Sequence, residues 1–576
     1  MTWEQALVLI SLVALIVVLV RGRIAPAVAF SGIAFAYYVV GLISLESALA
    51  QFTNTALVTV VLLLLLSIAL DKSRLLELVA DRLLAGPYRW VLFKIITATA
   101  VTSGFVNNTA VVATLIGPLR SSSRHPASRL LIPMSYAATV GGVLTLIGTS
   151  TNLLIDGFLT SSGLPGLSLF QQMPLGFVLL ATVTLLLVIT GPRLLPRHDN
   201  KSSMLSDYFL EAEVQPASRL IGRTVWENGL RNLNHLFLAE IVRRGELIAP
   251  VEPSEVLVAG DLLVFSGDVR RIDVLAPFDG LLTHGHKAGL PVDNLVEVLV
   301  TADSMLVHRT VKEAEFRSRF DAAVIAVRRG PSQLAGAIGT LRLRAGDTLV
   351  LATGPDFEKR NNLTRNFIII SRPSIAKFSD WRKSAAVVAA FVAVVAGAAA
   401  GWFDFVKGLL VLLAAFLLTR LLTLGELRRN APFSLLFIIP SALIVSKAMF
   451  ETGSAQLLAR AVLAVCEPFG PLGALIGVLL LTALLTELMT NNAAAALAFP
   501  IAIGTAQQLG TSHLPFAMAV LFGASASFIT PYGYQTNLMV MSPGGYTLRD
   551  YLRAGVPVSA LYLTGAAVLI PVFFPL

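Results

Sequence analysis

The sequence predicts a polytopic α-helical membrane protein made of two similar membrane blocks around one polar insert. Of its 576 residues, 55% are hydrophobic and 14% are charged, whereas soluble domains carry about a quarter charged residues. Apolar segments of about 20 residues, each long enough to cross a bilayer once, recur before and after the insert. These observations exclude a soluble globular protein.

Ten apolar segments are predicted to cross the membrane, five in each block. They lie near residues 3–20, 24–43, 54–70, 130–158 and 173–191, and near 384–401, 405–424, 432–450, 514–541 and 555–575. Between the third and fourth spans of each block lies a longer apolar stretch, near 90–118 and 470–506, that paired asparagines interrupt. A straight crossing fits these stretches poorly, so each is predicted to be a re-entrant helical hairpin. The first span lacks a basic n-region and a cleavage site and is expected to be retained.

The distribution of Lys and Arg between the short loops predicts the orientation of the spans. Basic residues gather in alternate loops, which places both ends of the 90–118 stretch inside and both ends of the 470–506 stretch outside. The insert, residues 197–378, is expected in the cytoplasm and the chain in the inner (plasma) membrane. Since each block crosses five times, an odd number, the second block is predicted to run opposite to the first, as an inverted repeat.

Two polar motifs occur once in each block at matching spacing. Thr102–Pro118 reads TSGFVNNTAVVATLIGP and Thr486–Ile503 reads TELMTNNAAAALAFPIAI, while Gly148–Leu153 reads GTSTNL and Gly533–Leu538 reads GYQTNL. Asn108 and Asn152 are 44 residues apart, and Asn492 and Asn537 are 45 residues apart. The matching spacing indicates a duplicated site.

Polar breaks in hydrocarbon-length segments cost several kcal/mol for each unpaired group when they face lipid. A discontinuous helix exposes carbonyls at one half-helix and N–H groups at the next, so it can bind a hard cation and an anion together. We expect two cation sites flanking one anion site. The alternative is that the asparagines only cap turns and cross-link helices, and the duplication of the pattern favours a binding site.

These motifs resemble those of the divalent anion/sodium symporter family, which carries dicarboxylates, citrate and sulfate within the ion transporter superfamily. The family's Ser-Asn-Thr tripeptide at each hairpin tip is matched by Asn107–Thr109 and by Asn491–Ala493. Its Gly-Thr-Pro-Pro-Asn motif at each broken span is matched by Gly148–Asn152 and more loosely by Gly533–Asn537. The resemblance implies a homodimer in which a transport domain moves against a scaffold domain like an elevator.

The resemblance also implies roles for individual residues. Sodium ligands would come from Asn108, Gly148, Thr149, Asn492 and Thr530. The anion would be faced by Asn107, Thr109, Thr151, Asn152, Asn491, Thr536 and Asn537. Asn in place of Ser at both tips, Ala493 in place of Thr and the loss of both Pro pairs favour a sulfate-like dianion over a dicarboxylate. Because neither tip nor broken span contains Lys or Arg, helix dipoles and co-bound sodium would balance the anion's charge, which predicts obligatory cation coupling.

Glu487 is a carboxylate within a predicted membrane hairpin, four residues before Asn491. It is either a proton carrier or a hydrogen-bond partner that braces the hairpin, and the family's usual Thr-Glu before the second tripeptide favours bracing. We predict a secondary active transporter that couples sodium entry to the import of a small divalent anion, and two alternatives stay open. One is a proton-coupled anion exchanger, and the other is a membrane anion sensor that signals through the insert.

The polar insert contains a tandem repeat at an offset of 85 or 86 residues. Arg223-Thr224 recurs as Arg309-Thr310, Arg243-Arg244 as Arg328-Arg329, and Gly260-Asp261 as Gly346-Asp347. Each copy, 207–290 and 291–372, is predicted to be a small α+β unit similar to the C-terminal domain of potassium-transport regulators. The membrane repeats are then 1–196 and 378–576. The Arg pairs either bind an anionic ligand or are solvated strand ends.

Several classes of function are excluded or not expected. A single cysteine, Cys466, cannot form an intrachain disulfide. The net charge of +9 is explained by basic residues beside the spans, so no nucleic-acid partner is expected. The sequence has no nucleotide fingerprint, Walker motif or metal-ligand spacing, and an enzyme or an ATP-driven pump is not expected. The expected partners are a small dianion, lipid, a second copy of the chain and a ligand of the insert.

Overall fold

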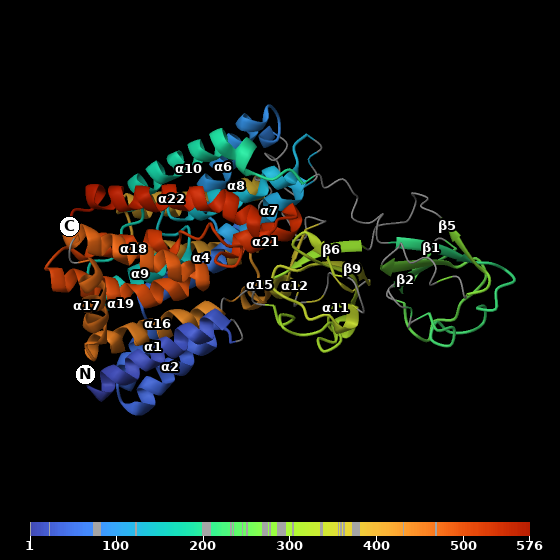
Figure 1. The fold of residues 1–576 in the computed structure, drawn as a ribbon, viewed down its shortest axis with the longest axis horizontal. Helices are drawn as coiled ribbons and strands as arrows, with labels where there is room; N and C mark the ends of the chain where they lie inside the picture. Colours follow the sequence, from blue (N-terminus) through green and yellow to red (C-terminus); the bar gives the residue numbers. More distant parts are fainter. Residues whose placement is uncertain are drawn as a thin grey trace.

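The computed structural model describes most of the chain. It leaves out residues 1, 22–23, 73–81, 121, 123, 199–208, 231–232, 234–235, 245, 249–250, 268–274, 276–277, 285–294, 302–303, 335–337, 355, 358–359, 361–362, 371–380, 430, 432 and 467–468. The predicted domain boundaries at 207, 290, 291, 372 and 378 lie outside the described residues. Figure 1 shows a helical body with both chain ends at one end of it and the insert attached at the other.

The first block is helical where the apolar segments predicted it. Its helices are α1 (Trp3–Arg21), α2 (Pro26–Val40), α3 (Leu45–Phe52), α4 (Thr55–Asp71), α6 (Tyr88–Ser103), α7 (Asn108–Arg120), α8 (Leu131–Gly142), α9 (Ser150–Ser161) and α10 (Met173–Leu194). The fourth predicted span is two half-helices, α8 and α9, with a non-helical stretch at 143–149 between them. The predicted hairpin is formed by α6 and α7.

The second block repeats this order of elements. Its helices are α13 (Trp381–Ala399), α14 (Phe405–Leu418), α15 (Leu424–Arg429), α16 (Phe433–Glu451), α17 (Ser454–Cys466), α18 (Gly470–Leu488), α19 (Asn491–Leu509), α20 (His513–Ala524), α21 (Gln535–Gly544) and α22 (Leu548–Phe573). The hairpin is now α18 and α19, and the broken span is α20 and α21 with 525–534 between them. In both blocks the first arm of the hairpin packs on the first half of the broken span, α6 on α8 and α18 on α20.

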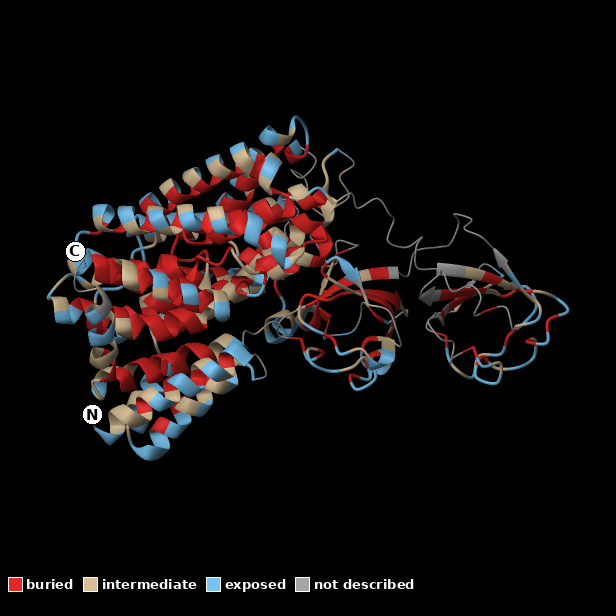
Figure 2. Ribbon diagram, in the orientation of Figure 1, coloured by how far each residue is buried: buried red, intermediate tan, exposed pale blue. Residues whose placement is uncertain are grey.

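The outer helices present apolar side chains to their surroundings, whereas the broken spans lie inside. In the part of the chain that the structure describes, seven helices are long and apolar enough to cross a membrane. Ile10 on α1 and Val572 on α22 are 67% and 68% exposed, and all residues of α8 are buried. Figure 2 shows this contrast between pale outer faces and a red interior. The chain is therefore a multi-pass membrane protein, as predicted, whose polar breaks are enclosed by protein.

The insert contains two antiparallel five-stranded sheets. The first has the order β3-β2-β4-β1-β5, from β1 (Phe209–Val214), β2 (Leu236–Arg243), β3 (Glu246–Ile248), β4 (Leu262–Gly267) and β5 (Leu281–His284). The second has the order β10-β6-β9-β7-β8, from β6 (Leu295–Val300), β7 (Ala322–Arg329), β8 (Ser332–Gln333), β9 (Thr348–Thr353) and β10 (Phe367–Ile369). Two short helices, α11 (Phe316–Phe320) and α12 (Leu363–Asn366), accompany the second sheet.

The same details recur in both sheets. A bulge interrupts the β2–β4 pairing after Leu238 and the β7–β9 pairing after Val324, 86 residues later. Arg243 donates two hydrogen bonds to the fully buried Asp261, and Arg329 does the same to Asp347. These bonds raise the pKa of both guanidinium groups. Since the bonds tie each strand end to its Gly-Asp turn, they favour a structural role for Arg243 and Arg329 over binding of an anionic ligand.

Candidate functional site

The tips of the two hairpins are built alike. The Ser103 hydroxyl lies within hydrogen-bonding distance of Asn108 Oδ1 and, at 2.9 Å, of the Ala138 carbonyl in α8. The Thr486 hydroxyl lies 3.1 Å from Asn491 Oδ1 and 2.7 Å from the Ala524 carbonyl in α20. In both tips a hydroxyl five residues earlier holds the asparagine that opens the second helix of the hairpin. The structural counterpart of Asn108 is thus Asn491, and the alignment of Asn108 with Asn492 is wrong by one residue.

The two broken spans are also held in the same way. Asn152 donates from Nδ2 to the carbonyls of Gly142 at 3.0 Å and Thr145 at 2.8 Å. Asn537 donates from Nδ2 to the carbonyls of Ser527 at 2.9 Å and Thr530 at 3.5 Å. The acceptors precede each asparagine by ten and seven residues. Each amide therefore satisfies carbonyls that the helix break has freed.

The tip of each block meets the broken span of the other block. At the first tip, Asn108 Nδ2 donates to the Tyr534 hydroxyl at 2.5 Å, and the Thr109 hydroxyl lies 3.4 Å from Gln535 Oε1. The Ser135 hydroxyl of α8 lies 2.9 Å from the Thr536 hydroxyl and 2.7 Å from Asn537 Oδ1 of α21, and so joins the two broken spans.

The second tip makes the corresponding contacts. Asn492 Nδ2 lies 3.2 Å from the Ser150 hydroxyl, and the Thr151 hydroxyl donates to Asn492 Oδ1 at 2.9 Å. Asn492 thus has the place that Thr109 has at the first tip. Because Ser135 links the two broken spans and each broken span contacts the tip of the other block, the tips and the broken spans form one continuous polar cluster.

Exposure separates the predicted site residues into two groups. Asn107 is exposed, and Thr109, Thr149, Asn491, Asn492 and Thr530 are partly exposed. Thr151, Asn152, Thr536 and Asn537 are buried, with at most 1% of their surface exposed, and Asn108 has 4% exposed. Gly148 is buried, and a side chain there would lie 2.5 Å from the Gly142 carbonyl oxygen. The predicted contact of Thr151, Asn152, Thr536 and Asn537 with the anion stays a prediction; in this structure each of these residues forms hydrogen bonds within the cluster.

The Glu487 carboxylate braces the second break. It accepts hydrogen bonds from the backbone N–H groups of Phe528 at 2.9 Å, Ile529 at 2.8 Å and Thr530 at 3.0 Å. An ionised carboxylate only accepts hydrogen bonds, and three N–H donors suit that form. Of the two predicted roles, this geometry favours bracing over proton transfer.

The cluster contains buried oxygen atoms of the kind that coordinate hard cations. Asn152 Oδ1 is buried and has no hydrogen-bond partner among the described residues, which leaves its lone pairs for a cation that prefers oxygen ligands. Asn537 Oδ1, in contrast, accepts from the Ser135 hydroxyl at 2.7 Å. The described residues contain no group of three or more His, Cys, Asp or Glu side chains that could hold a metal ion. The two halves therefore offer unequal sets of mostly uncharged oxygens.

Sequence reasoning missed Ser103, Ser135, Ser150, Tyr534 and Gln535. A signal for one of them existed, because a hydroxyl residue precedes an asparagine of each doublet by five positions, Ser103 before Asn108 and Thr486 before Asn491. For the other four, the contacts join residues about 340 to 430 positions apart. Local spacing does not reveal such contacts.

The matching family and two of the three relatives below are named as membrane transporters or cotransporters. The model of a family described as citrate transporter matches residues 7–523. A Chlamydomonas reinhardtii protein named "Putative sulfur deprivation response regulator" is 32% identical over 565 residues, or 92% of this chain and 95% of that protein. An uncharacterized transporter of Synechocystis is 30% identical over 569 residues, or 93% and 92% of the two chains. Sodium/sulfate cotransporter 1 of C. reinhardtii is 25% identical, over 90% of this chain and 83% of that one.

Proposed function

The chain belongs to the citrate transporter family, within the ion transporter superfamily, and from this premise we propose that it couples sodium entry to the import of a small divalent anion. One observation supports the proposal above all: the hairpin tip of each block contacts the broken span of the other block. These contacts gather oxygens and helix ends from both halves into one cluster inside the helical body.

Two cation sites are proposed, one for each half. The first takes the Asn108 and Asn152 side chains with carbonyls of the 143–149 stretch, and the free Asn152 Oδ1 supports it. The second takes Asn491 at the position of Asn108, with Asn492 and carbonyls near Thr530. Asn537 Oδ1 is already bonded to Ser135, so we propose that the second site is the weaker one.

The anion is proposed to lie between the tips. Asn107, Thr109, Asn491 and Asn492 reach the surface there, and α7 and α19 both begin at the tips with their N–H groups unpaired within the helix. Because no Lys or Arg occurs in either tip or break, the charge of a dianion is balanced by helix ends and bound cations. This supports sulfate or a similar dianion first and a dicarboxylate second.

The proposed movement is an elevator step of the unit that contains both hairpins and both broken spans. The duplicated order of hairpins and broken spans supports it, because the tip of each block contacts the broken span of the other. A homodimer in the inner membrane, with the sheets of the insert in the cytoplasm as regulatory domains, completes the proposal. In this proposed orientation the short α15 and the C-terminal ends of α7 and α21 lie at the cytoplasmic face.

A membrane anion sensor is the second candidate. It is favoured by the relative whose printed name describes a response regulator for sulfur deprivation. The two candidates differ in flux, since a sensor binds the anion and does not carry it. A proton-coupled exchanger is less well supported, because all three N–H donors around Glu487 favour a fixed carboxylate.

A ligand screen on the purified full-length protein tests the proposal. Sulfate, thiosulfate, molybdate, succinate and citrate are each added with sodium or potassium, and the thermal midpoint is measured. A ligand at 100 times its Kd stabilises the folded state by about 2.7 kcal/mol. Sulfate is expected to raise the midpoint with sodium only, and this effect should be lost in Asn492→Ala. Equal stabilisation in potassium, or none by any anion, would overturn the proposal.

A further inference from the structure

The second sheet of the insert is attached to the ends of α7 and α21. Arg120, the last residue of α7, forms an ion pair with Glu297 of β6, with Nη1 and Oε2 2.6 Å apart. Their side chains are 19% and 12% exposed, so solvent screens this pair less than a surface pair. Leu299 of β6 and Ile370, which follows β10, belong to the hydrophobic core of the helical body. This sheet therefore packs against the helical body. We call this contact the seat; it consists of Arg120, Glu297, Leu299 and Ile370 together with the turns described next.

The turns of the second sheet cover α21. The Ser542 hydroxyl lies 3.4 Å from the carbonyl oxygens of Arg328 and Gly330. A side chain at Gly330 would lie 3.1 Å from the Met541 side chain, and one at Gly346 would lie 2.6 Å from Leu538. Both glycines have positive φ, 56° and 81°, so their backbone conformation and the close approach both favour glycine.

The first tip and the second break lie at the starts of α7 and α21, whereas the Arg120 and Ser542 contacts of the seat lie at or near the other ends of these helices. α7 has 13 residues and begins at Asn108, and α21 has 10 residues and begins at Gln535. At 1.5 Å per residue they span about 20 Å and 15 Å. They pack against each other, and Thr109 and Gln535 meet at the site end. A displacement of α7 or α21 at the seat would therefore move residues of the first tip or of the second break.

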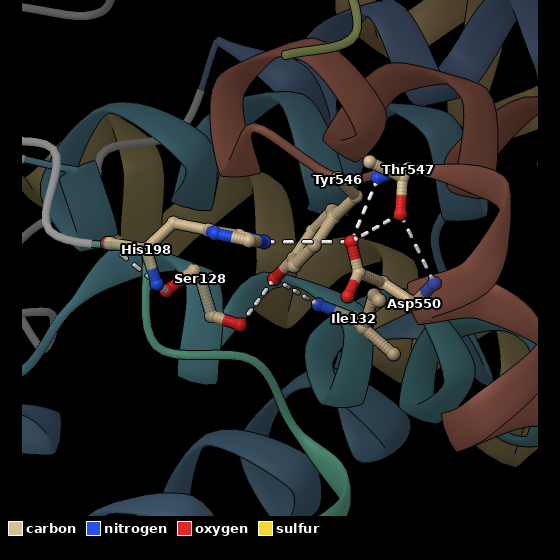
Figure 3. A network of polar contacts seen from close by, with 6 residues as sticks. All are labelled: Ser128, Ile132, His198, Tyr546, Thr547 and Asp550. Atoms are coloured by element: carbon tan, nitrogen blue, oxygen red, sulfur yellow. Dashed lines mark hydrogen bonds and ion pairs between the residues drawn. The ribbon is translucent and has the colours of Figure 1, made fainter.

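A network of polar contacts extends the seat to the next elements. Tyr546, whose carbonyl lies beside Gly330, donates from its hydroxyl to the Ser128 carbonyl at 2.8 Å and accepts from the Ile132 N–H at 3.2 Å. Asp550 caps the start of α22 through Thr547 and lies 3.4 Å from His198 Nε2. Figure 3 shows these residues converging on one corner. The corner joins α8, α22 and the segment that leads from α10 to the insert.

We infer that the second sheet of the insert controls the affinity of the anion and cation site, because its seat sets the positions of α7 and α21. This inference rests on the proposed function. An effector that binds the insert, or a change between its two sheets, would act on transport by loosening or tightening the seat. The sheet thereby differs from a passive tether, which would change the amount of folded protein and leave ligand affinity unchanged.

Charge reversal at the seat tests this inference. The apparent sodium affinity of full-length protein is measured from the thermal midpoint at fixed sulfate. Arg120→Glu and Glu297→Arg are each expected to weaken it about five-fold, at the low end of typical coupling between sites. The double variant Arg120→Glu/Glu297→Arg should return it to within about two-fold of wild type, because the pair re-forms with opposite polarity. Ser542→Ala is a milder change that tests the contact of the second sheet with α21. It is expected to weaken the apparent sodium affinity about two-fold.

Glu313→Gln is the matched control. Glu313 lies in the same half of the insert, where its exposed side chain lies 3.9 Å from Arg342 and accepts a hydrogen bond from the Thr310 N–H, so the sodium affinity of Glu313→Gln should equal that of wild type. Unchanged affinity in both single reversals and in Ser542→Ala, or no recovery in the double variant, would overturn the inference. If the reversals do not fold, Ser542→Ala alone decides. A wild-type protein that does not respond to sodium would instead overturn the proposed function.

Discussion

Replacing Glu487 separates a brace from a proton carrier. The carboxylate accepts three backbone N–H bonds of 2.8 to 3.0 Å from residues 528–530. In Glu487→Gln an amide NH₂ replaces one oxygen and faces an N–H donor, so at least one bond is lost and one N–H is left unpaired. Such a loss costs about 1–3 kcal/mol. Glu487→Ala removes all three bonds, and we expect a cost of about 4 kcal/mol or more, which is exceptional for one substitution.

The assay compares stability with transport. Thermal unfolding of the purified variants is expected to rank wild type above Glu487→Gln and Glu487→Ala lowest, and sodium-driven uptake into proteoliposomes should fall in the same order. Glu487→Asp serves as the control, because it keeps the carboxylate and only shortens the side chain by one methylene group. A Glu487→Gln protein with wild-type stability that loses uptake driven by a pH gradient would refute the brace and establish a proton carrier.

Four further substitutions and one control, Gly32→Ala, have defined outcomes. Asn108→Ala removes a proposed sodium ligand and should weaken the apparent sodium affinity at least ten-fold in the thermal assay; an unchanged affinity would contradict this role. Asn152→Ala leaves two buried carbonyls without their donor, at a cost of about 2 kcal/mol in unfolding experiments, and a neutral result would show that the break is held otherwise. Gly533→Ala would place Cβ 2.1 Å from a hydroxyl oxygen and should abolish folded protein on size exclusion, whereas Gly32→Ala, with open space around it, should elute as wild type. Arg243→Gln leaves a buried carboxylate without its partner and should destabilise the first sheet by about 3 kcal/mol, seen as faster proteolysis of the insert; wild-type resistance would argue against the structural role.

Much of the helical body follows from apolar runs and loop charges. The two interruptions, at 143–149 and 525–534, lie where Gly-Thr-x-Thr-Asn and its looser copy predict them, because a break in hydrocarbon needs polar partners nearby. The multi-pass membrane protein predicted from these features is confirmed, and so is the resemblance to sodium/sulfate carriers.

The register of the second tip was missed, although the five-residue spacing from Thr486 to Asn491 matches that from Ser103 to Asn108. An asparagine doublet allows two alignments, and only the Thr486 hydroxyl, which binds Asn491, selects one of them. The reach of Tyr534 from one break to the opposite tip depends on how the two halves pack. The seat depends on an ion pair between Arg120 and Glu297, 177 residues apart, and no periodicity marks such a pair.

Flux through reconstituted wild-type protein tests the central claim most directly. Labelled sulfate uptake is measured in proteoliposomes with an inward sodium gradient, an equal potassium gradient, or a proton gradient alone. The account predicts accumulation of sulfate above equilibrium with the sodium gradient only. Binding of sulfate without flux, or accumulation that the proton gradient drives without sodium, would contradict it.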